Sequence, residues 1–96
     1  MSNSKVYHGI TQAVFDCVRA TSIKQHGTVY TPPNSNSGKT STSGTGWTVD
    51  MTFNFDPGSG ALSYTITHKT WIVPESAIWS GLDATINGCQ QSNFAG

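Results

Sequence analysis

The segment from Trp47 to Asp56 constrains the fold most, because apolar and polar residues alternate along it without a break. Successive side chains of a β-strand point to opposite faces, so the alternation predicts a strand with one buried face. Pro57 and the glycines of residues 56–60 are typical of a turn. A return strand is expected from Ala61 to about Val73. Its core-facing side chains would be Leu62, Tyr64 and Ile66.

Two further segments have helical spacing. From about Ser4, the expected N-cap, to about Ala20, apolar residues recur every three or four positions. This stripe consists of Val6, Ile10, Ala13, Val14 and Cys17. A second helix is expected to start at Pro74 and to stop at Asn87-Gly88, leaving residues 90–96 as a loose C-terminal tail. Its stripe consists of Ile78, Leu82, Ile86 and Cys89.

The middle of the chain is polar. The β-forming residues near Val29 predict a short strand around His26 to Thr31, which Pro32 ends. Residues 34–46 contain no apolar side chain and are expected to form a flexible loop. The predicted fold is therefore a single α+β domain spanning residues 1–96, a two-layer sandwich with the order α-β-β-β-α. A three-stranded antiparallel sheet would carry two helices on one face.

Each predicted helix carries one cysteine on its buried stripe, near its C-terminal end. These are Cys17 and Cys89. We expect the two to be neighbours and to form a disulfide, which would close most of the chain into a loop. Two free, buried thiols are the alternative.

Composition excludes several classes of function. Lys and Arg total 5, Asp and Glu total 5, and this balance argues against nucleic-acid binding and against docking on an acidic membrane. No apolar run is long enough to span a bilayer. Charged residues are only 10%, whereas 12 serines and 13 threonines supply polarity. Such surfaces are commoner on secreted or periplasmic proteins, although the N-terminal residues show no secretory signal.

Motifs for catalysis and cofactors are not convincing. Residues 37–41 resemble the end of a phosphate-binding loop, but Pro33 stands where that motif needs glycine. The histidines lie on separate elements without metal-type spacing, and His68 is expected at the edge of the core. Double-stranded RNA-binding domains share the predicted element order, but nothing after Lys69 is basic. We therefore predict no catalytic residue, no metal and no cofactor, and we keep a small hydrolase using His8 or His68 as a minor alternative.

The candidate binding residues lie on the face of the sheet opposite to the predicted core. Alternation along the return strand places Trp71 and Lys69 on this face, unless a β-bulge shifts the alternation by one residue. The alternative for Trp71 is that it covers the end of the sheet. Thr67, Thr52 and Asp50 share this face, and Trp79 lies one position off its helix stripe. Exposed tryptophans among hydroxyls are typical of binding surfaces.

The function predicted from these features is that of a small non-enzymatic recognition domain. It would bind a protein partner as an inhibitor, immunity protein or accessory subunit, through the outer sheet face and the loop 34–46. The alternative is a carbohydrate or small-ligand module that stacks its ligand on an exposed tryptophan. The chain would be a monomer or a weak homodimer.

Overall fold

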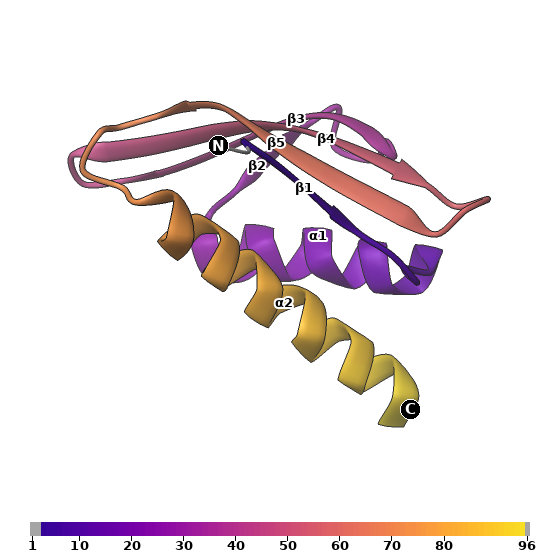
Figure 1. Ribbon diagram of the computed structural model, residues 1–96. Coiled ribbons are helices and arrows are strands. Elements are labelled where there is room, and N and C mark those ends of the chain that lie inside the picture. Colours follow the sequence, from indigo (N-terminus) through magenta and orange to yellow (C-terminus); the bar gives the residue numbers. More distant parts are fainter. Residues whose placement is uncertain (1–2, 96) are drawn as a thin grey trace.

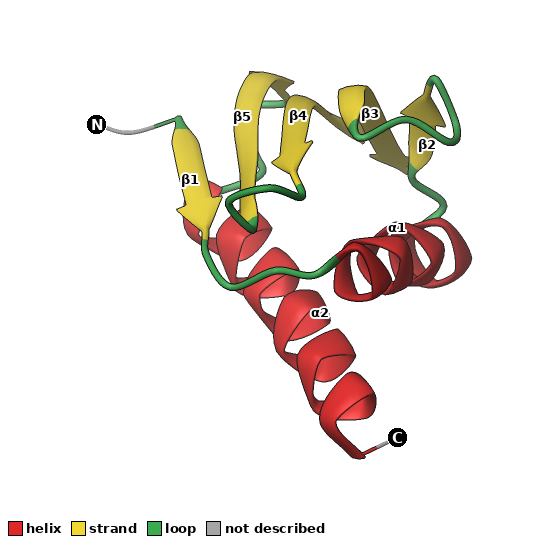
Figure 2. Cartoon of the chain, turned by 90° about the vertical axis from the view of Figure 1, so that its right-hand side faces the viewer, coloured by secondary structure: helices red, strands yellow, loops and turns green. Residues whose placement is uncertain are grey.

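The computed structural model describes residues 3–95, which form one antiparallel sheet and two helices. The strands lie in the order β1-β5-β4-β3-β2, and both helices lie under the same face of the sheet (Figures 1 and 2). In chain order the elements are β1 (Ser4–Tyr7), α1 (Gln12–His26), β2 (Val29–Thr31), β3 (Ser37–Gly44), β4 (Trp47–Asp56), β5 (Ala61–Lys69) and α2 (Glu75–Ala95). The α+β class is as predicted, but the prediction of a three-stranded sheet in the order α-β-β-β-α is wrong.

The predicted hairpin forms the centre of the sheet. Strand β4 has the predicted bounds, and β5 pairs with it along its length. The backbone N–H of Gly60 donates to the Asp56 carbonyl at 2.8 Å, and Gly60 takes a φ of 73°. That left-handed backbone favours glycine, so the turn closes where the sequence indicated.

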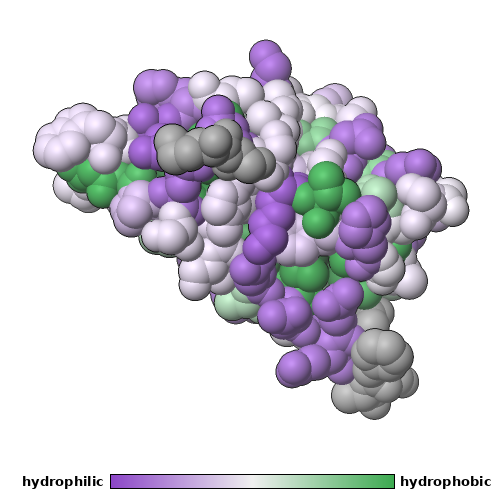
Figure 3. Space-filling model, viewed as in Figure 1, coloured by the Kyte–Doolittle hydropathy of each residue, from purple (hydrophilic) through white to green (hydrophobic). Residues whose placement is uncertain are grey.

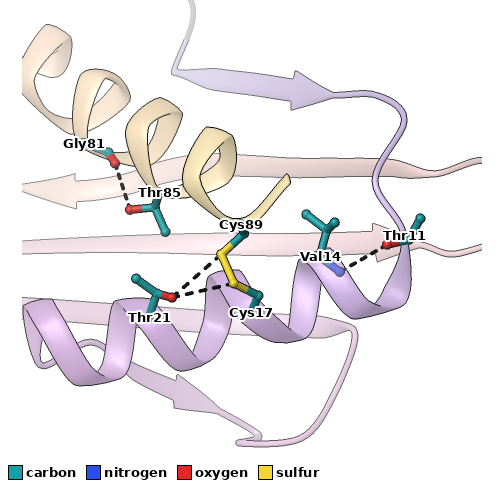
Figure 4. The surroundings of a disulfide bond; sticks show 7 residues. All are labelled: Thr11, Val14, Cys17, Thr21, Gly81, Thr85 and Cys89. Atoms are coloured by element: carbon teal, nitrogen blue, oxygen red, sulfur yellow. Dashed lines mark hydrogen bonds between the residues drawn. A yellow bond between two sulfur atoms is a disulfide. The ribbon is translucent and has the colours of Figure 1, made fainter. Parts of the chain in front are cut away.

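A strand replaces the start of the predicted first helix. Residues Ser4–Tyr7 pair with β5 as an edge strand, and Gly9, with a φ of 71°, turns the chain toward the helix. Thr11, not Ser4, is the N-cap, because its hydroxyl accepts from the Val14 N–H at 3.2 Å (Figure 4). The apolar spacing in this region is thus shared between a strand and a helix.

The polar segment 34–46, predicted as a flexible loop, contains strand β3. Its main chain pairs with β4 on one side and with β2 on the other. Backbone hydrogen bonds do not require apolar side chains, so a Ser/Thr-rich segment can fill the ladder beside a strongly alternating neighbour. Gly46, with a φ of 79°, provides the tight turn between β3 and β4.

Helix α2 continues through the predicted stop at Asn87-Gly88 and includes residues 90–95 of the predicted tail. Ile86 and Cys89 are both buried at 3% exposure, so packing extends the helix past its glycine. Gly96 lies outside the described residues.

The core is an aromatic layer between the inner face of the sheet and α1. Phe15 stacks on Phe55 with ring centroids 5.0 Å apart, and Tyr30 meets Phe53 edge to face at 5.2 Å. The hydroxyls of Tyr30 and Tyr64 lie 3.0 Å apart and satisfy each other inside this layer. Burial raises the pKa of both tyrosines, so the pair stays protonated.

The predicted disulfide is present and joins the two helices. Cys17 of α1 and Cys89 of α2 are bonded with their Cα atoms 5.8 Å apart, and the Thr21 hydroxyl lies beside both sulfur atoms (Figure 4).

A second link, between side chains of β1 and α2, holds the edge strand to the helix. Lys5 contacts both carboxylate oxygens of Asp83 at 2.9 and 3.0 Å, and the Tyr7 hydroxyl donates to the same carboxylate at 2.5 Å.

Removal of the disulfide should destabilise the fold without changing it. The bond spans a sequence separation of 72 residues. The chain-entropy model gives it about 4 kcal/mol for a loop of that length. The variant with Cys17→Ala and Cys89→Ala should lose about this much free energy of unfolding in guanidinium titrations. An unchanged midpoint, or two titratable thiols in the denatured, unreduced parent, would contradict the assignment.

Stability should fall in acid through Asp83. The Tyr7 hydrogen bond first, and then Lys5, lower the pKa of Asp83, so its contribution is present above the ordinary carboxyl pKa and is lost as the pH falls through the folded value. Asp83→Asn should cost about 1 kcal/mol or less near pH 7, because the ion pair is partly exposed, and nothing near pH 2. Tyr7→Phe should raise the pKa of Asp83 in a carboxyl NMR titration. An equal cost at both pH values would show that the carboxylate charge is irrelevant.

Candidate functional site

The outer face of the sheet is open, since both helices lie on the inner face (Figure 2). No element of residues 3–95 covers it. The strand register aligns polar side chains across all five strands, in a row made of Ser4, Thr65, Thr52, Lys39 and Thr31. The hydroxyls of Ser4 and Thr65 lie 2.8 Å apart within this row. The result is a flat surface of hydroxyls with a few charges.

A depression of about 410 Å³ marks this face, and we call it the outer groove. It brings together three predicted binding residues, Asp50, Thr52 and Thr67. It also contains Thr31, which the sequence reasoning missed, and Lys39 and Ser41, which it included only as part of the binding loop 34–46. Lys39 and Ser41 belong to β3, whose polar sequence concealed both its strand character and its outward side chains. The signal available was the tight Thr45-Gly46 turn before the alternating strand.

A β-bulge changes the phase of β5. Asp50 pairs with His68 but Met51 pairs with Ile66, so Thr67 is the extra residue, and its hydroxyl donates to the Asp50 carbonyl at 3.2 Å. Beyond the bulge, Lys69 pairs with the buried Val49 and therefore takes the inner face. Two predictions are wrong for this reason: Lys69 is not on the outer face, and His68 is exposed rather than placed at the core edge.

The two candidate tryptophans occupy different environments. Trp71 lies in the connection between β5 and α2 and is 87% exposed. Figure 1 shows this connection at the same end of the molecule as the turn between β3 and β4, and Figure 3 shows a pale projection with green beneath it at that end. Trp79 packs against the core cluster from α2. Trp71 is therefore the more exposed of the two, and it lies beyond the end of β5 rather than within the outer groove.

A second hollow, the inner cavity, lies between the inner face of the sheet and the two helices. It measures about 440 Å³. Trp47, Val49 and Met51 of β4 form one wall, and Ile78 and Leu82 of α2 face them. No sequence pattern indicates this cavity, because its lining comes from separate segments of the chain.

The described residues include no group of three or more His, Cys, Asp or Glu side chains that could hold a metal ion. His8, His26 and His68 lie on a connection, at the end of α1 and on β5, respectively. Within the same residues no helix is long and apolar enough to cross a membrane. Comparisons of the chain with protein-family models, curated proteins and solved structures found no match.

Proposed function

We propose that this chain is a small, non-enzymatic recognition domain that binds a protein partner through the outer face of its sheet. The observation that carries the proposal is the one-sided burial of a five-stranded sheet, which leaves the whole outer face free. Hydroxyl and amide groups there can exchange hydrogen bonds with water for hydrogen bonds with a partner. Inhibitor, immunity and accessory-subunit roles all use such a surface.

The chemistry of the outer face supports a partner with mixed polar and apolar contacts. Lys39 and Asp50 place opposite charges in the outer groove, which would orient a partner. Val6 and Val29, on the two edge strands, point outward and are 49% and 60% exposed. Apolar area at these edges would add to the hydrogen bonds made at the centre of the sheet.

The disulfide supports a location in an oxidising compartment. Disulfides persist in secreted and periplasmic proteins and are rare where thiols are kept reduced. Cys17 and Cys89 are bonded, and the surface draws its polarity from Ser and Thr. We infer that the partner is also encountered outside the cytosol.

The outer-face proposal predicts the behaviour of two arginine variants. Thr52→Arg places a long charged side chain at the centre of the face, and Ser80→Arg makes a similar change on the exposed side of α2. In affinity capture from native extract, the Thr52→Arg variant should lose at least about 90% of a partner that the parent retains, since a buried unpaired charge costs several kcal/mol. The Ser80→Arg variant should retain the partner. Equal recovery by Thr52→Arg and the parent would remove the outer face from the model.

Carbohydrate binding at Trp71 is the second candidate, favoured by the 87% exposure of this side chain. Stacking on a sugar ring would blue-shift and change the intensity of Trp71 emission, because the indole leaves water. Glycans that bind the parent on an array should not bind Trp71→Ala and should still bind Trp79→Phe. Retained binding by Trp71→Ala would contradict a stacking role.

A further inference from the structure

We propose that the inner cavity is a binding site for a small amphiphile with an apolar body and one oxygen-bearing head group. This site is separate from the outer face, because the sheet lies between them. Its volume of about 440 Å³ is within the range of roughly 300–1,000 Å³ that is usual for small-molecule sites. A hollow of this size suits a molecule of small-metabolite dimensions.

The walls provide an apolar surface for the body of the ligand. Val49 and Met51 come from the sheet, and Ile78 and Leu82 come from α2. Trp47 also lines the hollow, and its indole lies against Gly44 on the neighbouring strand, where any Cβ atom would overlap the ring. Because glycine stands at that position, the indole can lie flat along the wall.

The polar groups of the cavity come from neighbouring parts of the chain. Ser22 and His26 are on the last two turns of α1, and Thr28 follows that helix. The Thr28 hydroxyl pairs with that of Thr42, on β3, at 2.7 Å, so the segment after α1 and the strand β3 present their polar groups at the same place. Ser22 and Thr28 are each 7% exposed. Hydroxyls and an imidazole can donate hydrogen bonds to a carboxylate or hydroxyl head group of the ligand. The apolar body of the ligand would then contact the walls formed by β4 and α2.

The mouth of the cavity also favours an apolar occupant. Ile72 lines the cavity and is 51% exposed, and Trp71 beside it is the most exposed large apolar residue described. Both belong to the connection between β5 and α2, which forms the rim. Apolar side chains left in water at the rim of an apolar cavity would be covered in part by a bound ligand.

The chain offers a matched pair of variants to test this site. Gly81 lines the cavity and Gly88 does not, yet both are in α2, and a Cβ atom at either position would meet nothing within 4 Å. Leucine at either position should increase helix propensity, so both variants should fold. Only Gly81→Leu places a side chain in the cavity.

The probe is 1-anilinonaphthalene-8-sulfonate, an aromatic body with an anionic oxygen head, titrated by fluorescence with decanoate as competitor. The parent should bind it at one site from which decanoate displaces it. Gly81→Leu should weaken this binding by about tenfold or more, the equivalent of losing a small part of the contact surface, and Gly88→Leu should match the parent. If Gly81→Leu does not fold, Ala77→Phe, in the lining, with Ala84→Phe as its control, provides the same comparison.

Two outcomes would overturn the proposal. Equal probe affinity for the parent and the folded cavity-filling variant would show that the probe binds elsewhere. A concentration-dependent dimer that Trp71→Ala dissociates and Gly81→Leu blocks, measured by sedimentation, would show that the cavity holds a second copy of the chain instead. A parent that stays monomeric and binds the probe, together with loss of binding only in the filled variants, supports the small-molecule site.

Discussion

The structure depends on a single sheet that has only one apolar face. Phe53, Phe55, Leu62 and Tyr64 all point to the inner side and are nearly fully buried. Apolar area on one side of a sheet must be covered, and α1 and α2 supply the cover from the two ends of the chain. The side chains between them in sequence point the other way. Because only 10% of the residues are charged, the polar side chains on the outer face of the sheet are mostly the hydroxyls of Ser and Thr.

Two links set the position of α2, and neither lies at the inner cavity. The disulfide ties Cys89 to α1, and Asp83 is held by Lys5 and Tyr7 of β1. The α2 residues that line the cavity extend from Ala77 to Thr85, on both sides of Asp83 in the sequence, and Trp47 of β4 also lines it. Met51 borders both the cavity and the outer groove, so the two candidate sites are separated by the thickness of the sheet.

Three of the six binding residues predicted from the sequence lie in the outer groove. Asp50 and Thr52 follow directly from the alternation of β4, and Thr67 reaches the same groove. Lys69 was misplaced because a bulge adds one residue to β5, and a one-residue shift moves every later side chain to the other face. Trp79, which the spacing placed one position off the apolar stripe of its helix, is partly buried and packs against the core cluster.

The sequence by itself determined the central hairpin and its single apolar face, and it predicted the Cys17–Cys89 disulfide that the structure confirms. These follow from local alternation and from stripes of apolar residues, which each segment carries within itself. Only the tertiary structure decided that Ser4–Tyr7 and Ser37–Gly44 are strands, because each is held by hydrogen bonds to another segment, Ser4–Tyr7 to the distant β5 and Ser37–Gly44 to β4 and β2 on its two sides. The phase of β5 beyond its bulge and the inner cavity were decided in the same way. Both arise from contacts between segments, and no single segment contains the information that specifies them.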